Sequence, residues 1–133
     1  MPNGLEKTLP TGMPNCLKKR RLLNEKELSP QLCREYGEKF LALDWWEDAL
    51  EFFRKGNHQE GVAKIKALAL ENGDAFLLGR VVKDQDPELW RQAAVRAQAL
   101  GKLCFARRAW EMAGDEKKAG EISRLIAGDK TLP

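Results

Sequence analysis

Residue types that start and end helices recur at short intervals along this chain, and this spacing of helix caps constrains its fold more than any other feature. Candidate N-caps are Asn15, Ser29-Pro30, Asp44, Asn57, Asp74, Asp86-Pro87 and Asp115. Candidate C-terminal glycines are Gly56, Gly73, Gly101, Gly114 and Gly128. Such residues satisfy the free backbone groups at the two ends of a helix. The sequence therefore predicts a succession of short helices.

Apolar residues between these signals follow the helical period. One stretch presents Leu32, Cys33, Tyr36, Phe40 and Leu43 at three- and four-residue spacing. No stretch alternates apolar and polar residues as a half-buried strand would. Residues 15–28 are expected to form a helix that Ser29-Pro30 ends. Residues 44–47 have the spacing of a capping box that starts another helix.

Connections of only two to five residues favour antiparallel neighbours. We therefore expect an all-α fold of about seven helices, arranged as antiparallel hairpins in a short α-solenoid or a right-handed helical array. Residues 16–133 are predicted to be a single domain, and the Pro- and Gly-rich residues 1–15 a flexible arm. The pattern M-P-N-x-L-x-K occurs at 1–7 and again at 13–19. It is a duplicated recognition motif, an extension before an alternative start, or a coincidence.

Small and aromatic residues alternate in a recognisable order near the C-terminus. A large residue is followed by a small one, a glycine, a second small residue, an aromatic residue and a third small residue. These residues are Trp90, Ala94, Gly101, Ala106, Trp110 and Ala113. A looser version runs from Trp46 through Ala49 to Gly56. On these residues the chain resembles the tetratricopeptide-like and coatomer-like α-solenoid families over roughly residues 44–127. The alternative is a non-repeating helical bundle in which alanine and tryptophan fill the core.

The resemblance implies a non-enzymatic adaptor that binds a peptide or helix of another protein. Four arginines flank the alanine-rich faces and are candidate partner-binding residues: Arg91, Arg96, Arg107 and Arg108. In such a groove, Trp90 or Trp110 would anchor an apolar side chain of the partner. The large apolar surface of the two indole rings is instead better removed from water, which favours a core position for both tryptophans.

Positive charge is concentrated at the front of the chain. Residues 1–34 carry a formal charge of +4 and residues 35–133 carry −1. The excess centres on four adjacent candidate binding residues, Lys18, Lys19, Arg20 and Arg21. Such a cluster could contact nucleic acid, which is the alternative function, or anionic lipid or an acidic protein. It could equally be a solvated helix turn, and four cations without interleaved aromatic residues would bind phosphates only weakly.

Residues suited to catalysis or metal binding are scarce. The cysteines Cys16, Cys33 and Cys104 do not have the close spacing of zinc ligands. Cys33 and Cys104 lie among apolar residues and are expected to be buried. Cys16 is an activated thiolate beside the basic cluster or an unreactive surface thiol. His58, the single histidine, falls in a turn. We therefore expect no catalytic site, metal or cofactor, and keep a redox role of Cys16 or Cys104 as a third hypothesis.

The expected location is the cytoplasm. No apolar run approaches the roughly 20 residues that span a bilayer. The first residues do not resemble a secretory signal, and an odd number of cysteines suggests reduced thiols. Stacked repeats need caps at their ends. Either the N-terminal helices and residues 115–127 provide these caps, or the chain forms a homo-oligomer.

Overall fold

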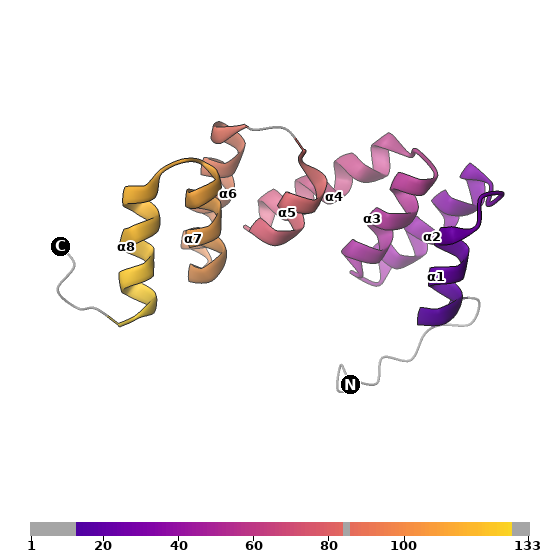
Figure 1. Cartoon of the computed structure of the whole chain (residues 1–133), viewed down its shortest axis with the longest axis horizontal. Helices are drawn as coiled ribbons and strands as arrows, with labels where there is room; N and C mark the ends of the chain where they lie inside the picture. The colour runs from indigo at the N-terminus through magenta and orange to yellow at the C-terminus, as the bar shows by residue number, and fades with distance from the viewer. Residues whose placement is uncertain (1–12, 84–85, 129–133) are drawn as a thin grey trace. The chain divides into compact units, whose positions relative to one another are not determined.

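The computed structural model describes residues 13–83 and 86–128, and these residues form helices without any strand (Figure 1). The helices are α1 (Cys16–Asn24), α2 (Pro30–Ala42), α3 (Trp46–Lys55), α4 (Gln59–Glu71), α5 (Ala75–Val81), α6 (Pro87–Ala99), α7 (Leu103–Met112) and α8 (Glu116–Ile126). The predicted all-α fold is confirmed, with eight helices in the described residues where the sequence predicts about seven. The predicted arm, residues 1–15, lies outside the described residues except for its last three.

The chain divides into two compact units, Met1–Val62 and Ala63–Pro133, and the boundary falls inside α4. In the N-terminal unit, α2 packs against α3, and α1 contacts α3. In the C-terminal unit, α6 packs against α7 and α7 against α8, while α5 contacts both α6 and α7. The single domain predicted for residues 16–133 stays a prediction.

Five of the predicted N-caps are confirmed. In each, the side-chain oxygen accepts a hydrogen bond from the backbone N–H three residues further on. These bonds join Asn15 to Lys18 (2.8 Å), Ser29 to Leu32 (3.1 Å), Asp74 to Leu77 (3.0 Å), Asp86 to Leu89 (3.3 Å) and Asp115 to Lys118 (3.0 Å). Such a cap is worth about 1 kcal/mol to its helix.

One kind of turn joins five pairs of consecutive helices in the described part of the chain. Its left-handed residues are Asp44 (φ 61°), Asn57 (53°), Gly73 (60°), Gly101 (73°) and Gly114 (82°). The N–H of the following residue then bonds the carbonyl oxygen five residues back, at 2.8–3.0 Å. This pair of features defines the Schellman motif. The next helix begins two residues after the left-handed residue each time, so the five connections share the same local geometry.

Asp44 and Asn57 end the preceding helices instead of starting new ones, so these two N-cap predictions are wrong. α3 begins at Trp46, with Trp45 as an N-cap that makes no side-chain cap bond, and the predicted capping box over residues 44–47 is wrong as well. Asp and Asn tolerate the left-handed conformation better than other non-glycine residues. The same residue types can therefore serve either end of a helix.

Gly56 is required for space and not for a left-handed turn. Gly56 is the C-cap of α3, as predicted, but its φ is −85° and Asn57 takes the left-handed position. A Cβ at Gly56 would lie 2.6 Å from Cβ of Cys33 and 3.1 Å from the carbonyl oxygen of Pro30. Glycine therefore lets the end of α3 approach the start of α2.

The first helix is shorter than the predicted span 15–28. α1 ends at Asn24, Glu25 is its extended C-cap, and Leu28 lies beyond the helix. None of its side chains is fully buried, and Leu17 is 77% exposed. With little apolar surface to hide, α1 gains little from packing that would lengthen it.

Aromatic rings fill the core of the N-terminal unit. Phe40 of α2 stacks on Phe52 of α3 with ring centroids 5.6 Å apart, and Tyr36 adds a ring 5.3 Å from Phe52. Cys33 is fully buried beside them, as predicted. Burial raises the pKa of the Cys33 thiol.

Alanine and tryptophan form the core between α6 and α7. Its buried residues are Trp90, Ala93, Ala94, Ala97, Ala106, Ala109 and Trp110. Small side chains bring two helix axes close, and each tryptophan is only 2% exposed. The core position predicted for both tryptophans is confirmed, so neither is an exposed anchor for a partner.

Cys104 is exposed, contrary to the prediction that it is a core residue. The buried positions of α7 are Ala106, Ala109 and Trp110. Cys104 precedes Ala106 by two residues, which is about 200° around the helix and so on its other side. Its apolar neighbours in the sequence belong to different faces.

Candidate functional site

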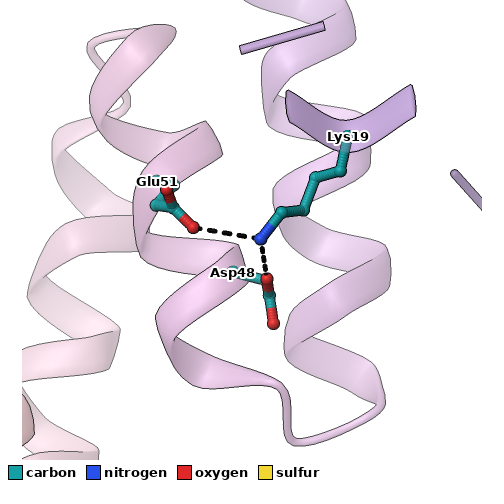
Figure 2. Close-up of polar contacts among 3 residues, drawn as sticks. All are labelled: Lys19, Asp48 and Glu51. Carbon is teal, nitrogen blue, oxygen red and sulfur yellow. Dashed lines mark hydrogen bonds and ion pairs between the residues drawn. The ribbon is translucent and has the colours of Figure 1, made fainter. Parts of the chain in front are cut away.

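One of the four clustered cations at the start of α1 is used by the fold itself. Lys19 Nζ forms ion pairs with Asp48 and Glu51 of α3, and lies 3.2 Å from Glu51 Oε1 (Figure 2). Burial alone lowers the pKa of Lys19, but hydrogen bonds to the two carboxylates and their charges outweigh it, so the pKa is raised. Lys19 therefore docks α1 on α3.

The other three cations of this cluster, Lys18, Arg20 and Arg21, are exposed. Successive residues of a helix point about 100° apart, so only Lys18 and Arg21 share a side. α1 contains no aromatic residue on which a base could stack. The cluster thus presents a smaller and more divided positive surface than the sequence suggests.

The four candidate arginines of the C-terminal unit lie in different surroundings. Arg91 pairs with Glu88 within α6 (2.5 Å), and Arg96 Nε donates to the carbonyl oxygen of Glu71 at the end of α4 (2.7 Å). Arg107 is half-buried. Arg108 is exposed and borders a surface depression. Arg108 therefore lies beside a hollow.

Residues of α7 and α8 line this hollow, which we term the α7–α8 groove. The two helices pack against each other (Figure 1). The groove encloses about 550 Å³ and is lined by Arg108, Glu111, Met112, Glu116, Ala119, Gly120 and Ser123. The residues from α8 share one face because they are three or four positions apart. Three of these, Ala119, Gly120 and Ser123, have small side chains, and we call this line of small residues the floor of the groove. The other lining residues are the apolar Met112 and the charged Arg108, Glu111 and Glu116.

Gly120 lies in this floor, in the interior of α8, and the chain's own packing does not require it. A Cβ there would meet no atom within 4 Å, and Gly120 does not have a positive φ. By contrast, a Cβ at Gly37, Gly56, Gly61 or Gly73 would come closer than 3.0 Å to a neighbour. Glycine in a helix interior costs about 0.5–1 kcal/mol relative to alanine. Glycine at position 120 therefore makes α8 less stable than alanine would, without a contact in the protein that requires glycine.

A second depression, of about 510 Å³, lies in the N-terminal unit. It is lined by Pro30, Gln31, Arg34, Glu35, Glu38, Gly56, Asn57 and His58. His58 is half-buried and its ring lies 5.2 Å from that of Phe53. Arg34 and Glu38 form an ion pair of 3.6 Å within α2. No serine or cysteine lines this hollow, so His58 has no nucleophile beside it there.

The thiols and carboxylates in the described ranges do not form a reactive cluster. Cys33 has a raised pKa, which disfavours the thiolate that attacks substrates or binds metals. Cys16 and Cys104 are exposed. No group of three or more His, Cys, Asp or Glu side chains is placed to hold a metal ion, and no helix has the length and apolar character to cross a membrane, among the residues described.

Two surface features were not predicted from the sequence. The first is the α7–α8 groove, which includes Gly120. A glycine inside a helical pattern, away from the helix ends, could have indicated this groove. The second feature is Phe76, which is 56% exposed on α5, whereas the neighbouring Leu77 and Leu78 are buried. Comparison of this chain with protein-family models, curated proteins and solved structures found no match.

Proposed function

We propose that this protein is a non-enzymatic helical-repeat adaptor that binds a helix of a partner protein in the α7–α8 groove. The observation that carries the proposal is Gly120, a helix-interior glycine without an internal role at the floor of that groove. The five matching turns between consecutive helices support the repeat architecture.

The groove suits a helix because of its shape and its border. A helix axis approaches another most closely where side chains are small. Ala119, Gly120 and Ser123 provide such a line along α8, and Met112 offers an adaptable apolar contact. Arg108 on one helix and Glu116 on the other would select the charges that flank the partner's apolar face.

A pair of variants at Gly120 tests this function. Gly120→Leu fills the floor of the groove, whereas Gly120→Ala adds a single methyl group in open space. We expect capture of proteins from the native lysate to be weakened by Gly120→Ala and lost with Gly120→Leu. A chemically synthesised helix from a captured partner should then show the same difference in titrations. Equal capture by both variants would rule out the groove, and a turnover activity would rule out the adaptor.

Association with nucleic acid through α1 is the alternative function. The exposure of Lys18, Arg20 and Arg21 favours it. Titration of labelled single- and double-stranded oligonucleotides at two salt concentrations tests it, because phosphate contacts weaken as salt rises. Replacing these three cations with alanine should abolish binding, and an unchanged affinity would dismiss the alternative.

A further inference from the structure

The outer side of α1 carries the most exposed large apolar side chain in the described part of the chain. Leu17 is 77% exposed, compared with 58% for Val95 of α6. Lys19, two residues further along α1, reaches the carboxylates of α3 (Figure 2). Two residues correspond to about 200° around a helix, so Leu17 faces away from the helix on which α1 docks.

Two arginines flank Leu17 on this outer side. Arg20 and Arg21 follow it by three and four positions, the spacing at which helical side chains are neighbours. Both are exposed, as is Lys18, and none of these three side chains forms an ion pair or hydrogen bond with another described residue. α1 itself contains no Asp or Glu. Leu17, Lys18, Arg20 and Arg21 thus form an apolar centre with an unpaired positive border, which we term the α1 outer surface.

We propose that the α1 outer surface binds the surface of a membrane that contains anionic phospholipids. Leu17 enters the boundary between headgroups and acyl chains, and Arg20 and Arg21 pair with phosphates on either side of it. Arginine suits this position, because its apolar stem lies along the inserted leucine while its guanidinium reaches the headgroups. The negative charge of such a membrane attracts the basic border, so binding depends on lipid charge and weakens as salt rises.

A lipid surface suits the α1 outer surface better than other anionic partners do. A protein partner holds an apolar side chain by a closely matched shape, and the two hollows described above are lined by residues outside α1. A fluid membrane needs no such match and accommodates a single protruding side chain. Nucleic acid would pair with the cations, but its phosphates and sugars offer no apolar medium to Leu17. α1 also has no aromatic residue on which a base could stack.

This surface belongs to the N-terminal unit, whereas the α7–α8 groove belongs to the C-terminal unit. The inference therefore goes beyond the proposed function and does not depend on it. It gives the cations of α1 a different partner from the alternative function, and Leu17 separates the two. Binding to a membrane requires this leucine, whereas pairing of the cations with nucleic-acid phosphates does not.

Sedimentation of the full chain with lipid vesicles tests the proposal. The probes are vesicles of phosphatidylcholine and phosphatidylserine in a two-to-one ratio, and vesicles of phosphatidylcholine alone. The chain should bind the mixed vesicles at least about tenfold more tightly than the neutral ones. Leu17→Ser should weaken binding to the mixed vesicles about tenfold. The matched control Val95→Ser removes another exposed apolar side chain and should leave the binding unchanged.

A second pair of variants tests the positive border. The double variant Arg20→Gln/Arg21→Gln should weaken binding to the mixed vesicles about tenfold or more. The double variant Lys64→Gln/Lys66→Gln removes the same net charge from exposed positions of α4. It should change the binding much less, because its charges lie outside the α1 outer surface.

The two exposed thiols show which helix meets the membrane. Cys16 precedes Leu17 on α1, and Cys104 lies on α7. A polarity-sensitive fluorophore attached to Cys16, in the variant Cys104→Ser, should shift its emission to the blue when mixed vesicles are added. The same fluorophore on Cys104, in the variant Cys16→Ser, should show no shift.

Several results would overturn the proposal. These are no binding of mixed vesicles at about 5 mM lipid and low salt, equal binding of neutral vesicles, an equal loss with either control variant, or a blue shift at Cys104 alone. An oligonucleotide bound more tightly than the vesicles, with no loss in Leu17→Ser, would reassign the surface to nucleic acid. A polyglutamate peptide bound more tightly than the vesicles would reassign it to an acidic protein. Gly120→Leu should leave vesicle binding unchanged, and circular dichroism checks that each variant remains helical.

Discussion

The indole Nε1 of Trp110, on α7, donates a hydrogen bond of 2.7 Å to Oε1 of Gln98, on α6. Trp110 is 2% exposed, so this bond satisfies the one polar atom of an almost fully buried ring. From α8, Lys118 Nζ lies 4.4 Å from the ring centroid. One tryptophan thereby links three consecutive helices that pack in sequence.

Gln98→Ala should destabilise the protein, because it leaves the buried indole N–H without an acceptor. The expected loss is about 1–2 kcal/mol in the free energy of unfolding, measured by urea denaturation. Gln98→Glu keeps an acceptor oxygen at this position and should lose less. Equal stability of Gln98→Ala and the parent chain would show that the bond contributes nothing to the fold.

Lys19→Met should weaken the docking of α1. The ion pairs to Asp48 and Glu51 are partly exposed, so their loss is expected to cost about 0.5–1 kcal/mol, and less at high salt. Lys18→Met, at an exposed neighbouring position, is the matched control and should change little. Chemical denaturation at low and high salt measures both variants, and a loss at Lys18 as large as at Lys19 would contradict the assignment.

The contribution of Lys19 should also depend on pH. Its pKa is raised in the folded chain, so the folded state holds the proton more tightly than the unfolded state. The stabilisation is then fully present below the ordinary lysine pKa of 10.5 and is lost as the pH rises through the raised value. The stability difference between the parent chain and Lys19→Met should stay constant from about pH 7 to 9 and shrink at higher pH.

Two glycine-to-alanine variants should change stability in opposite directions. Gly73 has φ +60°, and a Cβ there would lie 2.6 Å from backbone atoms of Ala97, so Gly73→Ala should cost about 2 kcal/mol or more. Gly120→Ala meets open space and removes a helix-interior glycine, so it should add about 0.5–1 kcal/mol. Thermal and urea unfolding measure both. A destabilising Gly120→Ala would reveal a packing role that the structure does not show.

The three thiols should differ in reactivity. Cys16 and Cys104 are exposed, whereas Cys33 is buried and burial raises its pKa. A chromogenic disulfide reagent at neutral pH should modify two thiols rapidly in the native protein and the third only after denaturation. The variant Cys33→Ala should keep both rapid reactions. Rapid labelling of all three thiols would show that the α2–α3 core opens readily.

The sequence predicted helix ends correctly where the capping residue could serve only one end of a helix. Ser29, Asp86 and Asp115 cap the helices that they precede, because the cap bond spans only three residues. Asp44 and Asn57 were assigned to the wrong helix, since the left-handed position after a helix accepts the same residue types. Where glycine takes that position, as at Gly114, the following aspartate is free to act as the N-cap.

Contacts across the chain decided the candidate sites. Lys19 belongs by sequence to a row of four cations, yet its partners lie 29 and 32 residues further on. Cys104 has apolar neighbours in the sequence but lies on the outer side of α7. The exposure of Phe76 and the open space at Gly120 likewise depend on which helix faces are covered.

The sequence alone therefore determined that this chain is helical, where most of its helices begin and end, and that Trp90 and Trp110 lie in its core. These properties depend on backbone bonds and apolar periods that extend over a few residues. The packing of the helices determines which cation forms ion pairs, which aromatic residue stays exposed and where a groove opens. Those outcomes depend on side chains that are distant in sequence and meet only once the helices have packed.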